Sequence, residues 1–122
     1  MTSFILPNAL TSFLTLQLYG NQLSEFSLPA FIDNIGSLAL SDNQLTSLIL
    51  PSTLTEFYIL YLDDTTNIDC TLCTSIPIIG KAIYGKYPLA NKWVGSVLVR
   101  DETQKAAFES NSKWGKYKIQ VK

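Results

Sequence analysis

The sequence predicts a β-rich solenoid that is closed at its carboxyl end by a strand and a helix. Three observations predict this fold: apolar residues recur every 22 residues, each repeat contains a Leu-x-Leu segment, and the regular period is lost after about residue 69. A unit of this length cannot bury its apolar face alone, so successive units must stack and share one core.

The repeat aligns without a gap over three units. Phe4, Phe26 and Leu48 share one column of the alignment. Other columns begin at Leu6, Pro7, Leu10, Phe13, Leu16, Leu18 and Leu23. Within a unit the pattern is L-x-x-L-x-L-x-x-N-x-L, which is typical of a leucine-rich repeat. We therefore predict a leucine-rich repeat solenoid of the α/β class, rich in β-structure, with about three 22-residue repeats.

Each element of a unit follows from its residues. Side chains alternate faces along a strand, so Leu16 and Leu18 point inward, whereas Thr15, Gln17 and Tyr19 point outward. Asn21 turns the chain after the strand, because its amide can satisfy unpaired backbone groups. The stretch from Phe26 to Pro29 predicts a second short extended segment. In the third unit the pattern weakens, and Ile68 is expected to fill the last apolar column through a one-residue slip, so that the regular solenoid ends near residue 68.

The chain divides into residues 1–69, which hold the repeats, and residues 70–122, which form a last irregular coil and a cap, within one folded unit. Residues 97–99 are expected to form a strand, and a helix capped by Asp101 or Thr103 is expected to run to Glu109. Residues 117–121 alternate as a closing extended segment. Phe108 and Trp114 are large enough to cover the apolar end of the last coil.

At the other end, the chain begins inside a repeat with no polar capping segment before Phe4. The first coil is therefore expected to leave an open apolar edge. Three explanations remain open: the chain is a fragment of a longer array, this edge docks onto a partner or a second copy, or the edge is simply tolerated. We predict concentration-dependent association through the N-terminal edge.

The carboxyl-terminal segment resembles the cap of bacterial BspA-like leucine-rich repeat proteins. The resemblance rests on the run from Val97 to Glu102, on Ala107-Phe108-Glu109, and on the segment from Asn111 to Ile119. This sequence departs from the family pattern at Arg100 and Phe108, where Pro and Tyr are usual, and its repeats lack the A-F-x-x-C segment. The resemblance implies a bacterial or bacteriophage surface protein that binds or adheres.

Composition and motifs argue against an enzyme. The chain of 122 residues has no His, and neither a nucleophile motif nor a carboxylate pair with a known catalytic spacing is evident. Cys70 and Cys73 are best interpreted as buried structural thiols, with a local disulfide or redox or shared-metal chemistry as alternatives. We expect no cofactor and no metal.

Charge and hydropathy narrow the class of partner. Residues 1–80 carry a net charge of −7 and residues 81–122 carry +6, which suggests separate roles for the two parts. The basic residues after residue 80, with Tyr84, Tyr87, Trp93 and Tyr117 among them, raise nucleic-acid or anionic-glycan binding. The low isoelectric point, near 5.2, and the acidic repeats argue against a nucleic-acid partner. Polar residues interrupt every apolar run, so no membrane span is expected, and the start of the chain has no features of a signal peptide.

The outward positions of the strands are the candidate binding surface. Stacked repeats place them in a ladder of three rows, from which the candidate ligand-binding residues are Thr15, Gln17, Tyr19, Ala39, Ile59 and Tyr61. The leading hypothesis is a recognition or adhesion module that binds a protein or a glycan there. It would lie at a cell surface or outside the cell, as part of a longer protein. The alternative is a structural assembly component, such as a virion or tail protein of a phage, that packs through the N-terminal edge.

Overall fold

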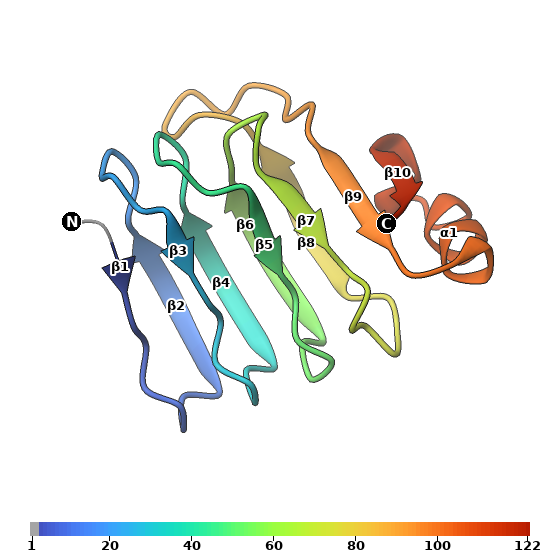
Figure 1. The fold of residues 1–122 in the computed structure, drawn as a ribbon, viewed down its shortest axis with the longest axis horizontal. Helices are drawn as coiled ribbons and strands as arrows, with labels where there is room; N and C mark the ends of the chain where they lie inside the picture. The colour runs from blue at the N-terminus through green and yellow to red at the C-terminus, as the bar shows by residue number, and fades with distance from the viewer. Residues whose placement is uncertain (1–2) are drawn as a thin grey trace.

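The computed structural model describes residues 3–122 and shows a parallel β-solenoid of about five turns with little helix (Figure 1). One face is a continuous sheet of four long strands in the order β2-β4-β6-β8. We call it the long-strand sheet, and its members are β2 (Ser12–Gln17), β4 (Asn34–Ala39), β6 (Glu56–Tyr61) and β8 (Ile78–Tyr84). The predicted β-rich solenoid is confirmed.

The other face consists of short strands in two separate sheets. The first sheet pairs β1 (Ser3–Phe4) with β3 (Glu25–Phe26). The second has the order β10-β9-β7-β5, with β5 (Ser47–Ile49), β7 (Asn67–Asp69), β9 (Ser96–Val99) and β10 (Lys118–Val121). No ladder joins β3 to β5 in the described part of the chain, so this face is interrupted between the second and third turns.

Paired residues of neighbouring long strands are separated by one repeat of the sequence. Phe13 lies opposite Ile35, and Ile35 lies opposite Phe57, so each partner is the equivalent position of the next repeat. Leu16, Leu38 and Leu60 form the next inward column in the same way. Ile35, Leu38, Phe57 and Leu60 are buried, which places the core between the two faces. The apolar columns therefore stack as continuous rows through the molecule.

The repeat count of three is wrong, because the solenoid continues beyond residue 68. Strand β8 extends the long-strand sheet, with Ile79 opposite Phe57 and Ile83 opposite Leu60. A bulge between these two pairs lengthens the offset by one position, which hides the fourth copy in an ungapped alignment. The predicted place of Ile68 is also wrong. Ile68 pairs with Leu48, which precedes it by less than one full repeat, and it therefore lies in the column of short-strand residues and not in the last apolar column of the repeat.

The asparagine that follows the Leu-x-Leu segment joins adjacent turns. Asn43 Nδ2 donates to the carbonyl of Leu18 at 2.9 Å, and Asn43 Oδ1 accepts from the backbone N–H of Leu23 at 3.0 Å. In the following turn Asp63 has the corresponding role, since its carboxylate accepts from the backbone N–H groups of Asp42 and Asn43. These bonds satisfy backbone groups that the turns would otherwise leave unpaired.

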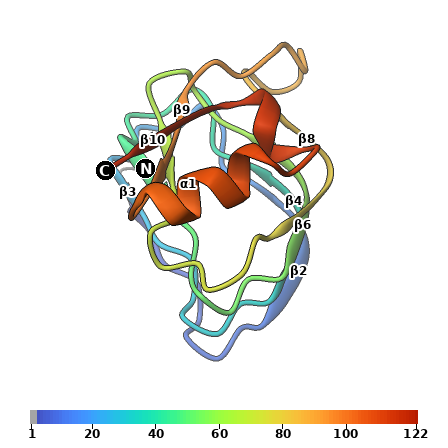
Figure 2. The same ribbon diagram turned by 90° about the vertical axis from the view of Figure 1, so that its right-hand side faces the viewer.

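The predicted cap is present. Helix α1 (Glu102–Glu109) begins after Asp101, whose side chain accepts from the N–H of Gln104, and it lies across the end of the solenoid (Figure 2). A single 3-10 turn, η1 (Trp114–Lys116), leads into β10. Phe108 and Trp114 are fully buried, as expected of residues that cover the core.

Side chains of the cap bond the exposed edge of β8. Trp114 Nε1 donates to the Pro77 carbonyl at 2.7 Å. Tyr117 Oη accepts from the N–H of Ile83 at 3.0 Å, and Lys113 Nζ donates to the Lys81 carbonyl at 3.3 Å. The cap therefore occupies backbone groups that would otherwise be free to pair with another strand.

The first turn is less well covered than the second. Phe4, Leu6, Phe13 and Leu16 are only partly buried, whereas Ile35 and Leu38 in the next turn are fully buried. In the described chain β1 and β2 each pair with one neighbouring strand only. None of the described helices is long and apolar enough to cross a membrane.

Candidate ligand-binding face

The register brings the predicted outward residues together on the long-strand sheet. Thr15 lies beside Ser37 and Ile59 in one row, and Gln17 lies beside Ala39 and Tyr61 in the next. Gln17 and Thr15 are exposed, and Ile59 and Tyr61 are partly buried. The six candidates thus lie on one face, although they differ in how far solvent reaches them.

Two outward positions are buried, contrary to expectation. Ala39 is 1% exposed, and Ser41, two residues further along the chain, is equally covered. The cause is Tyr87, which reaches across the face from beyond β8. Its backbone N–H donates to Ser41 Oγ at 2.9 Å, and its hydroxyl accepts from Gln17 Nε2 at 2.8 Å. Because Ala39 lies between Gln17 and Tyr61, both of which contact Tyr87, no ligand reaches it in this structure.

Four tyrosines gather at this place, and we call them the tyrosine cluster: Tyr19, Tyr61, Tyr84 and Tyr87. The Tyr87 ring lies 4.5 Å from that of Tyr19 and 5.0 Å from that of Tyr61, between centroids, and Tyr61 lies 5.6 Å from Tyr84. Tyr19 and Tyr61 are among the candidates that the sequence predicts. Tyr84 and Tyr87 are not, and the only available signal is their position among the basic residues after residue 80.

The segment that carries Tyr87 is held at both ends. Gly85 N–H donates to the Asn91 carbonyl at 2.7 Å, and Asn91 Oδ1 accepts from the N–H of Lys86 at 2.9 Å. Further on, the buried Trp93 donates from Nε1 to the Asp63 carbonyl at 3.0 Å. The peptide bond between Tyr87 and Pro88 is cis. The hydrogen bonds at both ends keep Tyr87 in contact with the face.

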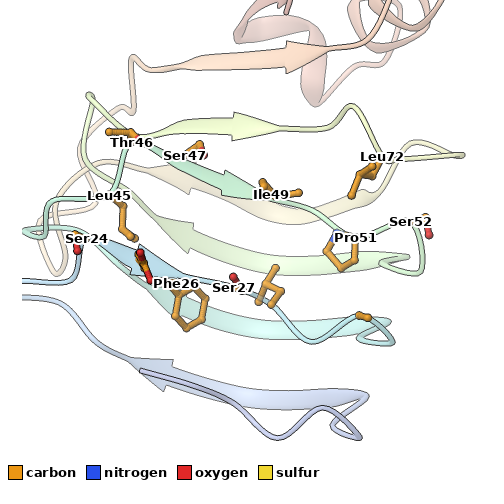
Figure 3. A pocket seen from close by; sticks show the side chains of 13 residues that line it. Ser24, Phe26, Ser27, Leu45, Thr46, Ser47, Ile49, Pro51, Ser52 and Leu72 are labelled. Atoms are coloured by element: carbon orange, nitrogen blue, oxygen red, sulfur yellow. The ribbon is translucent and has the colours of Figure 1, made fainter. Parts of the chain in front are cut away.

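A groove opens on the opposite face, where the short-strand ladder is interrupted between β3 and β5 (Figure 3). Its volume is about 560 Å³. Phe26, Ile49 and Leu72 give it an apolar lining, and serine and threonine hydroxyls, such as those of Ser27 and Ser47, add polar groups. Glu25 also lines the groove, which therefore combines apolar area with hydroxyl groups and one carboxylate.

The two cysteines are buried free thiols, as the favoured interpretation predicts. The ladder shows why they occur here: Cys70 follows Asp69, which pairs with Ile49, so Cys70 takes the place that Leu50 has in the previous turn. Burial raises the pKa of the Cys70 thiol well above its ordinary value, and the hydrogen bond with Cys73 and the charges of Cys73 and Asp69 act in the same direction. Cys70 is therefore a core residue in thiol form at neutral pH.

The acidic and amide side chains of the loop after β6 and of β7 make structural hydrogen bonds. Asp64 Oδ1 accepts from the N–H of Val94, and Asn67 Oδ1 accepts from the N–H of Ser96. Asp69 accepts from Thr71 and from Lys122 Nζ at 2.7 Å. No group of three or more His, Cys, Asp or Glu with metal-binding geometry occurs among residues 3–122.

Comparisons with known proteins place the chain in no family: no family model, no curated protein and no solved structure matches it.

Proposed function

We propose that this protein is a non-enzymatic recognition and adhesion module that holds a protein or glycan on the long-strand sheet. The observation that carries the proposal is the tyrosine cluster. Its members come from the first, third and fourth turns and from the segment after β8, and they meet on one outward face. Tyr19 remains 43% exposed, so part of this aromatic surface is open to solvent.

The chemistry of the cluster suits binding rather than catalysis. Tyrosine offers a rigid apolar ring and a hydroxyl that can donate or accept a hydrogen bond, and it loses little conformational entropy on binding. Neighbouring strands lie about 4.8 Å apart, so the cluster from β2 to β8 extends over roughly 14 Å along the solenoid axis. A ligand of several sugar or peptide units would cover that length.

We further propose that the repeats are leucine-rich repeats of the BspA-like kind. Two features support this assignment: the asparagine of the L-x-x-L-x-L-x-x-N pattern bonds the adjacent turn, and a strand-helix cap covers the last turn. The assignment implies that the protein acts at a bacterial cell surface or in a virion.

The test compares matched tyrosine variants. The protein is screened on a glycan array and on immobilised surface-protein extracts, and the dissociation constant of each ligand found is measured by biolayer interferometry. Replacing Tyr19 and Tyr61 together with Ala is expected to weaken binding about tenfold or more, because each ring contributes about 1 kcal/mol. Tyr58→Ala is the control, since Tyr58 is 52% exposed on the same strand as Tyr61 but lies outside the cluster. Equal binding by the double variant, or equal weakening by the control, would contradict the proposal.

A second candidate function is a structural assembly component that packs through the edge of the first turn. The partial burial of Phe4, Leu6, Phe13 and Leu16 favours it, because a contact there would complete their burial. Leu14, on edge strand β2, is 87% exposed. If this edge associates, Leu14→Glu abolishes concentration-dependent sedimentation, whereas Ile78→Glu on β8 does not. The variant with Ala at positions 19 and 61 still assembles under this alternative.

A further inference from the structure

A hollow lies next to the tyrosine cluster, between β8 and the cap. Its volume is about 360 Å³, and its lining includes Tyr84, Lys92, Lys116 and Tyr117, together with small apolar side chains such as Ala82. We call it the lysine pocket. The lining contains two ammonium groups and two phenols and no acidic side chain. Because Tyr84 belongs to both features, the pocket continues the binding face toward the cap.

The polar groups of this pocket retain unused hydrogen-bonding capacity. Tyr117 Oη accepts from the N–H of Ile83, so its own hydrogen remains available to donate. Burial raises the pKa of the Tyr117 hydroxyl, partly offset by that hydrogen bond, so the hydroxyl stays protonated at neutral pH. Its ring packs 5.8 Å from that of Trp93, and the Lys116 ammonium lies 5.6 Å from the centre of the Tyr117 ring.

The two lysines carry uncompensated charge. The ion pairs found within residues 3–122 join Arg100 to Asp101 and Lys122 to Asp69, and neither involves Lys92 or Lys116. The pocket also lies in the part of the chain whose net charge is +6. Ammonium groups beside phenolic donors favour an anion, because hydrogen bonds to a charged acceptor are stronger than neutral ones.

The surroundings favour a sugar over a peptide. An extended peptide would bind by pairing with an unoccupied strand edge, and the nearest edge is the outer one of β8. That edge is already occupied, since the side chains of Trp114, Lys113 and Tyr117 bond Pro77, Lys81 and Ile83. The pocket lining offers two partly buried phenols, alanine methyl groups and hydrogen-bond donors, which suit a ring with an apolar face and polar substituents.

We propose that the lysine pocket binds the carboxylate of an acidic sugar, which makes the ligand of the tyrosine cluster an acidic glycan. This inference rests on the proposed function for the rest of that ligand. Lys92 and Lys116 pair with the carboxylate, and the Tyr117 hydroxyl donates to it or to a neighbouring sugar oxygen. Tyr84 links the acidic unit to the units that lie on the tyrosine cluster.

The experiment is an amide-resonance NMR titration with glucuronate, and glucose is the neutral counterpart. Glucuronate is expected to shift the signals of residues 82–84, Lys92 and Lys116, while glucose leaves them unchanged at equal concentration. Replacing Lys92 and Lys116 with Gln is expected to weaken glucuronate binding about tenfold, equivalent to about 1.4 kcal/mol. Lys105→Gln with Lys118→Gln removes the same charge outside the pocket and is expected to have no effect.

Three outcomes would overturn the inference: glucose and glucuronate bind alike, the control pair weakens binding as much as the pocket pair does, or a tetraglutamate peptide shifts the same signals at lower concentration than glucuronate. A separate arm uses tetragalacturonate and the variant with Ala at positions 19 and 61. If tetragalacturonate no longer binds that variant more tightly than the monosaccharide does, the result supports both proposals. If tetragalacturonate still binds more tightly and glucuronate still binds, the proposed function of the cluster is wrong and the inference about the lysine pocket is supported.

Discussion

Removing the indole of Trp114 tests whether the cap and the repeats form one cooperative structure. Trp114 is fully buried, and its ring packs edge-on against Phe57 at 5.9 Å and against Phe108 at 5.1 Å. Truncation of a buried Trp to Ala costs about 3–5 kcal/mol. The change also leaves the Pro77 carbonyl without its 2.7 Å donor, a loss of about 1–3 kcal/mol where that carbonyl stays dry. Domains of this size have a total unfolding free energy of about 5–15 kcal/mol, so the variant is expected to be barely stable.

Trp114→Phe separates the two contributions, because it keeps a ring between Phe57 and Phe108 and removes the N–H. We expect it to lose about 1–3 kcal/mol. Urea unfolding followed by far-UV circular dichroism measures both variants, and for a slope near 2 kcal/mol/M the Ala variant is expected to lower the midpoint by about 2–4 M. Tyr58→Ala is the exposed control and is expected to change the unfolding free energy by less than about 1 kcal/mol. A Trp114→Ala loss below about 1 kcal/mol would show that the cap does not stabilise the repeats.

Three further predictions concern the repeats and their charge. Asn43→Ala should lose about 2–4 kcal/mol in urea unfolding because it breaks bonds to the adjacent turn, whereas Asn21→Ala, whose amide reaches only carbonyls of its own turn, should lose about 1 kcal/mol. Gly36→Ala should lose about 1–3 kcal/mol or more, since the added Cβ would overlap the Leu14 carbonyl oxygen; equal stability would refute so close an approach of the two strands. Burial alone raises the pKa of the Asp69 carboxyl, but hydrogen bonds from Lys122 and Thr71 outweigh it and hold the pKa below its ordinary value of 3.8. The ionised carboxylate therefore stabilises the fold at pH values above 3.8, and this stabilisation is lost as the pH falls through the pKa of the folded state. Between pH 7 and pH 3 the wild type should therefore lose more unfolding free energy than Asp69→Asn, and equal losses would contradict this.

The regular part of the fold could be predicted because its inward positions repeat without interruption. Leu16, Leu38 and Leu60 fall in one column only if the chain makes one complete turn per repeat, and the observed register pairs these three residues in succession. The fourth long strand escaped prediction for a local reason. The bulge after Ile79 moves Ile83 out of the period by one position, so an ungapped comparison loses it, although both side chains remain buried.

The tyrosine cluster could be predicted only in part, for a different reason. Tyr19 and Tyr61 occupy outward positions of the repeat, so their place on one face followed from the period. Tyr87 lies in the segment between β8 and β9. The chain between the paired residues Ile68 and Val97 is longer than the chain between the paired residues Phe4 and Phe26, so this turn contains an insertion. An insertion of this kind has no repeat partner, and no periodic signal relates Tyr87 to Gln17, 70 residues earlier in the chain.

Tyr87, which escaped prediction, completes the proposed site. Inward positions of a solenoid must be apolar in every turn, which makes them periodic and recognisable, while outward positions and insertions are free to vary. Tyr87 uses this freedom: it contacts Gln17 and Tyr19 of the first turn and Tyr61 of the third, so a single insertion bridges separate turns. If binding depended on the repeats alone, Tyr87→Ala would leave ligand affinity unchanged. If the insertion completes the site, as we propose, Tyr87→Ala weakens binding as much as the loss of Tyr19 does and leaves Ser41 and Ala39 open to solvent.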